Sequence, residues 1–264
     1  MVRVTTTDRR GVLRAGAGLV AGGALAAGCS STGPRPDAPS AGDSAPARPA
    51  SHPPLAAPAP RAFPQQPEQI THGPRGASRV ALTFHGQGDP ALARTLLTEA
   101  ERHGARVTVL AVGTWLDAHP EMARRILDGG HDLGNHTQRH VSINTMSEAD
   151  ARAEIAGCAD RLRRITGSIG TWFRPSRAPT ASPLVARLAR TAGYPHVLSY
   201  DVDSLDYTRP GAAAITRKVL AEARGGSVVS LHFGYPDTAA ALPGLLTELD
   251  RRGLHAVTTT ELLS

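Results

Sequence analysis

Apolar runs typical of β-strands alternate with segments of helical periodicity across residues 69–264 of this 264-residue chain. The run at residues 79–84 is typical of a buried strand, and Asp89-Pro90 then supplies an N-cap and a first-turn proline for a helix. Strands that alternate with helices predict an α/β fold with a parallel sheet and crossover helices. In such folds functional side chains gather where the strands end.

The same alternation continues to the C-terminus. Predicted strands lie at residues 79–84, 106–112, 131–134, 171–173, 196–200, 227–232 and 256–258. Predicted helices lie at residues 90–103, 120–129, 147–165, 181–192, 210–223 and 238–252. The long helix begins with Ser147, and Asp150 three positions later gives it a start that is similar to a capping box. These elements form one predicted domain at residues 69–264.

The N-terminal residues have the pattern of an export signal. The pair Arg9-Arg10 precedes residues 15–27, which carry no charge and are too few to span a membrane comfortably. The paired arginines resemble a twin-arginine signal. This pattern predicts that the chain leaves the cytoplasm.

A cysteine follows the apolar stretch. Small residues before Cys29 resemble a bacterial lipobox, although Ala26 stands where leucine is usual and Leu25 lies one place early. We expect residues 1–29 to be a twin-arginine-like lipoprotein signal peptide, with Cys29 lipid-modified and anchored in the membrane. Plain secretion is the alternative.

Residues 30–68 are rich in proline, alanine and serine and have no periodicity. Such a segment cannot bury enough apolar surface to offset its ordering entropy, so it predicts a disordered linker. The domain would then sit at the outer face of a bacterial cell membrane. The formal charge of +6 comes almost wholly from scattered arginines, and Lys218 is the one lysine. No nucleic-acid motif accompanies them, so we expect no nucleic-acid partner. We also expect the protein to be a monomer.

Two histidines four residues apart follow the predicted strand at residues 131–134. On one helical turn, His136 and His140 would face the same side and could bind one divalent metal ion. Several short motifs accompany them in order. They are Gly134-Asn135-His136-Thr137-x-x-His140, Trp172-Phe173-Arg174-Pro175, Asp203-Ser204-Leu205-Asp206-Tyr207 and Leu231-His232.

In this order and spacing, the four motifs resemble those of the NodB-homology polysaccharide deacetylases, carbohydrate esterase family four. Tyr207 stands where the family usually has tryptophan. The resemblance implies a deformed (β/α) barrel. It also implies a metal-dependent hydrolase, usually a zinc enzyme, that removes N-acetyl groups from amino sugars. The implied partner is an N-acetylated glycan such as peptidoglycan.

The resemblance also implies roles for individual residues. His136 and His140 would be metal ligands, and His232 would protonate the leaving amine. Asp206 would orient His232, and Arg174 would tune a catalytic carboxylate. Two alternatives for Arg174 and its neighbours stay open. Arg174 could pair with an aspartate of the fourth motif as a structural contact. We expect Trp172, Asp203 and Tyr207 to bind substrate, and the alternative is that these three residues are structural.

The first motif departs from the family. Where Thr-Phe-Asp-Asp-Gly is usual, this chain reads Thr83-Phe84-His85-Gly86-Gln87. His85 could be a third metal ligand, or it could be the general base, with the metal bound weakly or completed by Asp89. Alternatively the site is inactive, and the protein is a carbohydrate-binding or peptidoglycan-binding lipoprotein. Another amide or ester is a further possible substrate class.

Overall fold

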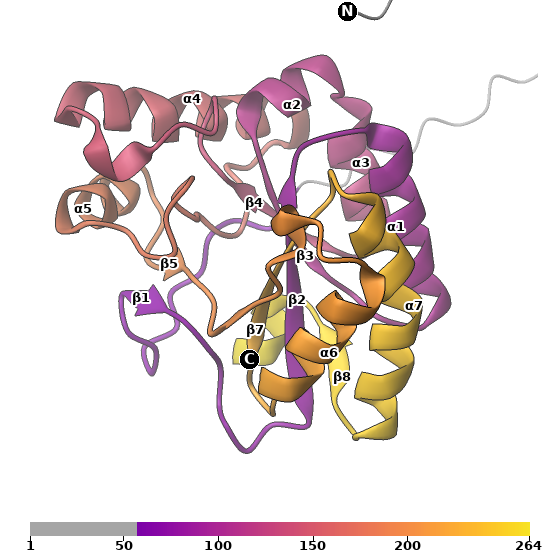
Figure 1. The fold of residues 1–264 in the computed structure, drawn as a ribbon. Helices are drawn as coiled ribbons and strands as arrows, with labels where there is room; N and C mark the ends of the chain where they lie inside the picture. The colour runs from indigo at the N-terminus through magenta and orange to yellow at the C-terminus, as the bar shows by residue number, and fades with distance from the viewer. Residues whose placement is uncertain (1–56) are drawn as a thin grey trace, which may run out of the picture. The chain divides into compact units, whose positions relative to one another are not determined.

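A computed structural model describes residues 57–264 of the chain. The predicted signal peptide, Cys29 and most of the predicted linker lie outside the described residues. Seven strands of the described residues follow the first short strand. They are β2 (Arg79–Gly86), β3 (Thr108–Ala111), β4 (Asp132–Asn135), β5 (Val197–Leu198), β6 (Val202–Asp203), β7 (Val228–His232) and β8 (His255–Val257). The predicted α/β class with a parallel sheet is confirmed (Figure 1).

Strand β2 is the centre of the sheet, which has the order β4-β3-β2-β7-β6. The first residues of β2 also pair with β8, and every strand pairing is parallel. A separate two-stranded sheet joins β1 (Gln69–Ile70) to β5. Single parallel bridges of Phe173 to Asn135 and Val197 link the two sheets. Within residues 57–264 these pairings do not close into the barrel that the resemblance implies.

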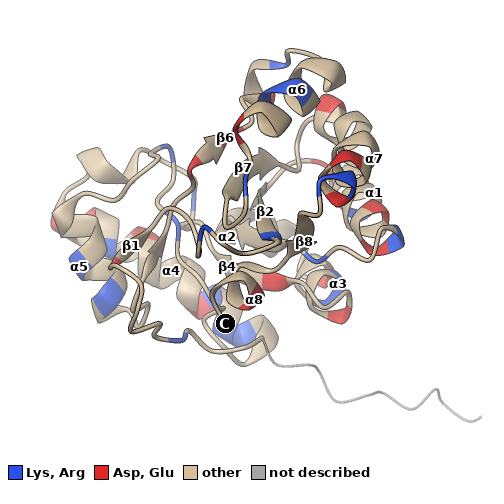
Figure 2. Cartoon of the chain, turned by 90° about the horizontal axis from the view of Figure 1, so that it is seen from below, with Lys and Arg blue, Asp and Glu red and all other residues tan. Residues whose placement is uncertain are grey.

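Helices cover both sides of this sheet. They are α1 (Pro90–Arg102), α2 (Gly113–Ala118), α3 (Glu121–Asp128), α4 (Glu148–Thr166), α5 (Pro183–Thr191), α6 (Ala212–Glu222), α7 (Pro236–Arg251) and α8 (Thr259–Leu263). Helices α1, α6 and α7 lie on one side of β2, and α4 and α5 lie on the other (Figure 1). Basic and acidic residues are interspersed on the outer helices (Figure 2). None of the helices in the described part is long and apolar enough to cross a membrane.

Local signals set the ends of these helices. Asp89 caps α1 by accepting a hydrogen bond from the Ala91 amide at 2.8 Å, and Ser147 caps α4 in the same way. Both predicted N-caps are therefore confirmed. Helices α2 and α8 were not predicted, because each is only one or two turns long and shows little periodicity.

The segment before β1 belongs to the folded domain. Phe63 is buried, and its ring stacks on that of Trp172 with 5.5 Å between centroids. The Phe63 amide donates to Nε2 of His196 at 2.9 Å, while Nδ1 of His196 donates to the Pro67 carbonyl. The prediction of a disordered linker up to residue 68 is therefore wrong for residues 57–68. One aromatic anchor and one bridging imidazole order a stretch whose composition alone indicates disorder.

This anchoring leads to a prediction about stability. Phe63→Ala should lower the free energy of unfolding by about 3 kcal/mol, because it removes a buried aromatic ring and leaves a cavity beside Trp172. Chemical denaturation followed by circular dichroism would measure the change. Gln65→Ala, two residues from Phe63 but exposed, is the matched control and should change stability by under about 0.5 kcal/mol. Equal effects of the two substitutions would show that the segment is not part of the cooperative unit.

Candidate active site

Three histidines meet at the carboxyl end of the sheet. His85 lies near the end of β2, His136 follows β4 directly, and His140 lies in the next loop. One nitrogen from each ring falls within 4.8 Å of the other two. Ligands of a tetrahedral zinc ion at 2.0–2.1 Å stand roughly 3.4 Å apart, so small side-chain rotations would bring these nitrogens to that spacing. The ends of β2 and β4, which flank β3 in the parallel sheet, thus bring the predicted metal ligands together.

The pairing of His136 with His140 does not come from a helical turn, as the sequence spacing suggested. The chain there is a loop in which Thr137 and His140 have left-handed backbones, with φ of 69° and 55°. The Thr137 amide donates to the Asn135 side chain at 2.8 Å, and the Thr137 hydroxyl donates to Ser176 at 2.9 Å. These side-chain contacts hold a strained turn that aims both imidazoles at one point.

The chemistry of His136 fits a metal ligand. Its Nδ1 donates to the Arg174 carbonyl at 3.0 Å, which leaves the lone pair on Nε2. That Nε2 is buried and has no hydrogen-bond partner among residues 57–264. A buried polar atom without a partner destabilises a folded protein by about 1–3 kcal/mol, so its presence here points to a functional role for this nitrogen. A backbone carbonyl that fixes the tautomer of a ligating histidine is a recurrent feature of metal sites.

All three rings are held in the neutral form that binds metals. Burial holds the pKa of His85 and of His136 well below the usual value of 6.5, and neighbouring imidazoles and Arg174 lower both further. Burial, followed by the charge of Arg177, lowers the pKa of His140 to about 4. At neutral pH each ring therefore offers an unprotonated nitrogen.

The lowered pKa values predict acid sensitivity of the metal-free protein. Between pH 6.5 and about 4 the unfolded chain binds a proton at His140 that the folded chain does not, so stability falls as pH falls. At pH 5 this ring alone should cost about 1–2 kcal/mol, allowing for screening of its partly exposed edge. Urea denaturation at pH 7.5 and 5.0 with a chelator would measure it. His140→Asn should lose part of this dependence; equal dependence in both proteins would refute the assignment.

Gly86 occupies the position of the family's second aspartate, and neighbouring strand β3 fills the space beside it. A Cβ atom on Gly86 would lie 2.9 Å from Cγ1 of Val109 and 3.0 Å from Cα of Ala111. Asp89 caps α1 and does not belong to the histidine group. The alternative in which Asp89 completes the metal site is therefore wrong. The donors that the described residues bring together here are three imidazoles.

His232 and Asp206 form a second unit beside the histidine group. Nδ1 of His232 lies 2.7 Å from Oδ1 of Asp206, and because a carboxylate only accepts, Nδ1 carries the proton. The other carboxylate oxygen accepts from the His232 amide at 2.8 Å and from the Thr238 hydroxyl at 2.7 Å. Asp206 is fully buried, whereas His232 lines a pocket. The predicted pairing of these residues is present in the structure, and Thr238, in the first turn of α7, has no motif that would have indicated it.

Arg174 is fully buried below these rings and pairs with no carboxylate in the described part of the chain. Its guanidinium donates to the carbonyls of Leu198 and Ser199 at 3.0 Å each and to the Thr83 hydroxyl at 2.9 Å. Burial lowers its pKa to about 10, which leaves it charged at neutral pH. The alternative pairing with an aspartate of the fourth motif is therefore wrong. The carboxylate that Arg174 was expected to tune is replaced by His85.

A pocket of about 520 Å³ lies over these groups. Its lining includes His85, His140, Asp203, Tyr207 and His232. Asp203 and Tyr207, two of the residues expected to bind substrate, thus line this pocket. Gln87 of the altered first motif also lines it, and further lining residues that no motif indicated are Arg177, Tyr200, Ser230 and Tyr235.

Trp172 lies elsewhere. Its side chain is buried against Phe63, and its indole nitrogen donates to the buried carboxylate of Asp132 at 3.1 Å. The prediction that Trp172 contacts substrate is therefore wrong, because its indole reaches Asp132 at the start of β4, away from the strand ends that carry the histidine group. The alternative of core packing is the correct one for this residue.

Backbone strain gathers around the pocket. Five non-glycine residues of the described chain have positive φ, namely Thr137, His140, Arg177, Leu205 and Arg209. The first three belong to the loops that carry or contact the histidine group, and the last two bracket the short 3-10 helix Asp206–Thr208. Each such backbone costs of order 1 kcal/mol and persists where surrounding contacts impose it, most often at functional sites.

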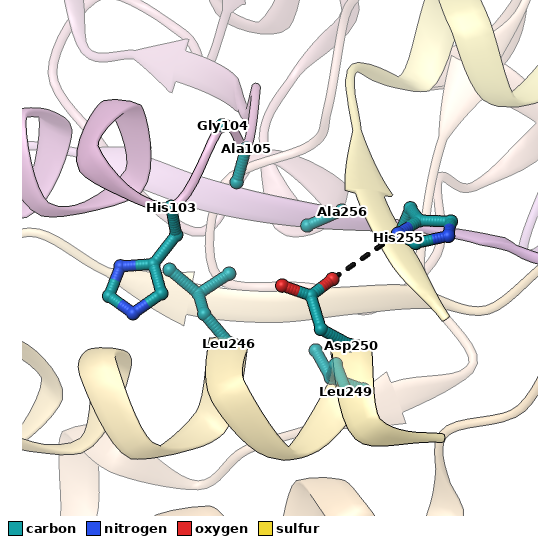
Figure 3. A pocket seen from close by; sticks show the side chains of 8 residues that line it. All are labelled: His103, Gly104, Ala105, Leu246, Leu249, Asp250, His255 and Ala256. Carbon is teal, nitrogen blue, oxygen red and sulfur yellow. Dashed lines mark hydrogen bonds and ion pairs between the residues drawn. The ribbon is translucent and has the colours of Figure 1, made fainter. Parts of the chain in front are cut away.

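A smaller hollow of about 170 Å³ lies between the end of α1 and the last turns of α7 (Figure 3). His103, Asp250 and His255 line it, and Nδ1 of His255 lies 3.3 Å from the Asp250 carboxylate. Among the described residues, these side chains do not bring three possible ligand atoms within 4.8 Å of one another, as His85, His136 and His140 do. The larger pocket is therefore the candidate active site.

A parallel α/β fold with clustered imidazoles and a histidine–aspartate pair at the strand ends defines a hydrolase-type site. The family model described as polysaccharide deacetylase matches residues 72–197. A peptidoglycan-N-acetylglucosamine deacetylase of Bacillus cereus is 30% identical over 194 residues, covering 72% of this chain and 90% of that protein. A chitooligosaccharide deacetylase of a Bradyrhizobium species is 28% identical over 203 residues, covering 68% and 88%.

A solved structure agrees with this relationship. It is the structure of a Bacillus anthracis pseudoenzyme of carbohydrate esterase family four, in a mutant form with restored enzymatic activity. The TM-score is 0.70 and the sequence identity 25%, and the match covers 75% of this chain and 72% of that one. The chain belongs to the polysaccharide deacetylase family, carbohydrate esterase family four.

Proposed function

We propose that this protein is a metal-dependent deacetylase that removes N-acetyl groups from amino sugars of cell-wall glycans such as peptidoglycan. The observation that carries the proposal is the group of His85, His136 and His140 beside the His232–Asp206 pair in one pocket. The Bacillus cereus relative, named for activity on peptidoglycan N-acetylglucosamine, supports this substrate class.

His85, His136 and His140 would hold the metal, and zinc suits them best. Three neutral imidazoles that leave one position open are a known catalytic zinc arrangement. When bound, zinc polarises an acyl carbonyl and lowers the pKa of water, which lessens the need for the aspartate base that this chain lacks. The unpartnered Nε2 of His136 supports this ligand set.

His232 would act as the general acid. With Nδ1 bound to Asp206, its Nε2 is the nitrogen that can deliver a proton to the leaving amine as the amide bond breaks. The rings of Tyr207 and Tyr235 stand edge-on to the imidazole, with centroids 5.6 and 5.7 Å away, and limit its rotation. Tyr207 and Asp203 would contact the sugar from the pocket wall. The products are acetate and a glycan with a free amine.

Acetate release tests the proposal directly. The full chain, loaded with zinc, cobalt, nickel or manganese, should release acetate from N-acetylglucosamine oligomers or from peptidoglycan, and elemental analysis should find about one metal ion per chain. Absence of acetate with all four metals would refute the activity on these substrates. Peptidoglycan binding without acetate release would instead support the non-catalytic, wall-binding alternative.

The proposed site of action is the outer face of the cell membrane. The support is the export pattern at residues 1–29 and the cysteine at its end. Lipid-modified Cys29 would anchor the protein, and the residues up to the folded domain would hold the domain, as a monomer, toward the wall. Cys29→Ser should move the protein from the membrane fraction to the soluble fraction; unchanged membrane association would refute the anchor.

A further inference from the structure

A serine interrupts the apolar run of β7 and contacts the histidine group. Ser230 lies between Val229 and Leu231, its side chain is 1% exposed, and it belongs to the lining of the pocket of about 520 Å³. Its Oγ lies 3.4 Å from Nε2 of His85, on the neighbouring parallel strand β2. A buried hydroxyl needs a hydrogen-bond partner, and within residues 57–264 this imidazole is the one that the Ser230 side chain contacts.

The ring of His85 carries a single proton at neutral pH, because burial holds its pKa well below the usual value of 6.5. A neutral imidazole has one N–H donor and one nitrogen with a free lone pair, so its chemistry depends on which nitrogen holds the proton. Nε2 of His85 is the nitrogen beside Ser230, whereas Nδ1 has no hydrogen-bond partner in the described part of the chain. The fold therefore supplies an acceptor for a proton on Nε2.

Two further polar side chains beside this ring are already committed. Thr83 precedes His85 by two residues and lies on the same face of β2. Its hydroxyl donates to the Val229 carbonyl at 2.7 Å and accepts from Arg174 at 2.9 Å. The Arg174 guanidinium has donors only. Neither side chain can replace the serine hydroxyl as the acceptor at Nε2.

We infer that Ser230 is a positioning residue that sets the tautomer of His85: Nε2–H donates to the serine hydroxyl, and Nδ1 presents its lone pair to the pocket. His136 has the opposite arrangement, since its Nδ1 donates to the Arg174 carbonyl and its Nε2 has no partner among residues 57–264. Two rings of one site are thus fixed through different nitrogens, one by a side chain and the other by the backbone. The inference rests on the proposed function for the role of His85 toward a metal ion.

An imidazole in the position of the usual aspartate needs such a partner. A carboxylate offers two equivalent oxygens, so it has no tautomer to select. An imidazole whose proton lies on the pocket side can neither bind a metal ion nor accept a proton there. Without the serine hydroxyl, the proton of His85 is free to occupy either nitrogen, and only one of the two forms is competent.

Nuclear magnetic resonance reads the tautomer directly and independently of catalysis. The full chain, labelled with ¹⁵N and treated with a chelator, is measured at neutral pH by two-bond ¹H–¹⁵N correlation. His85→Ala and His136→Ala proteins assign the signals of the two rings. We expect Nε2 to be the protonated nitrogen of His85 and Nδ1 to be that of His136. A protonated Nδ1 in His85 would overturn the inference.

Substitutions at position 230 test the consequence for metal binding. Ser230→Ala should let His85 populate both tautomers and should lower zinc affinity by about 10- to 100-fold, the usual effect of losing the partner of a ligating histidine. Ser230→Thr keeps the hydroxyl and should retain the wild-type tautomer and affinity. Ser78→Ala removes an exposed serine hydroxyl just before β2 and is the matched control. Competition with a chelating dye would measure the affinities.

The outcomes separate this inference from the proposed function. An unchanged His85 tautomer in Ser230→Ala, or an altered tautomer with unchanged zinc affinity, would overturn the inference at any rate of acetate release. A tautomer and a zinc affinity that depend on the serine, without acetate release by the metal-loaded wild-type protein, would support the inference and overturn the deacetylase proposal. Because the tautomer is read first in the wild-type protein, the test does not depend on the folding of Ser230→Ala.

Discussion

His232→Ala is expected to lower the rate of acetate release by about 10²- to 10⁴-fold, the usual contribution of a general acid. The imidazole is the one group in the described pocket with a buried carboxylate behind it and a free nitrogen toward the substrate. Its loss leaves the amine to depart unprotonated. Steady-state kinetics on an N-acetylglucosamine oligomer would measure the change, which should fall on kcat more than on KM.

The structure offers a graded series for this prediction. Thr238→Val removes one hydrogen bond to Asp206 and should reduce kcat by a smaller factor, about 3- to 30-fold, while Thr238→Ser should retain most of the rate. His255→Ala, on the exposed start of β8, is the matched control and should have no effect. Metal content should be unchanged throughout. A His232→Ala protein with wild-type kcat would refute the role of His232.

His85→Ala is expected to abolish stoichiometric metal binding. Removal of contacts that merely support metal ligands typically costs 10- to 100-fold in affinity, so loss of a ligand from a three-histidine site should cost more than about 100-fold. The remaining pair, His136 and His140, gains no carboxylate ligand, because glycine at position 86 has no side chain and Asp89 caps α1. Elemental analysis after gel filtration would measure the loss, and acetate release should fall with it.

Two companion variants and one control sharpen this result. His136→Ala and His140→Ala should lose metal to the same extent, because each ring supplies one of three nitrogens. His103→Ala, at the end of α1, removes an imidazole outside the group and should retain the metal. Metal retained in His85→Ala, together with a lost rate, would identify His85 as the general base instead of a ligand.

The sequence was sufficient to predict the alternation of strands and helices and the meeting of His136, His140 and His232. Parallel strands end at the same edge of a sheet, so the residues that follow β4 and end β7 were expected at that edge. The loop geometry could not be predicted, because it depends on Ser176, far along the chain, which holds Thr137 in a strained turn. The spacing of four residues between His136 and His140 suggested a helical turn, whereas a loop brings the two side chains together.

The failures share another physical cause. Trp172 and Phe63 cannot be placed from local pattern, since each is buried by contact with the other across a long sequence separation. Thr238 and Ser230 belong to no motif, and tertiary contacts alone reveal their positions. A single aromatic anchor was enough to override a composition that indicates disorder.

The close fit of Gly86 against β3 also limits what a single substitution can achieve at this site. A side chain at position 86 requires β3 to shift, because Ala111 contributes a backbone atom to the contact that no substitution at Val109 removes. Any redesign of the ligand set is therefore easier at the three imidazoles than at position 86.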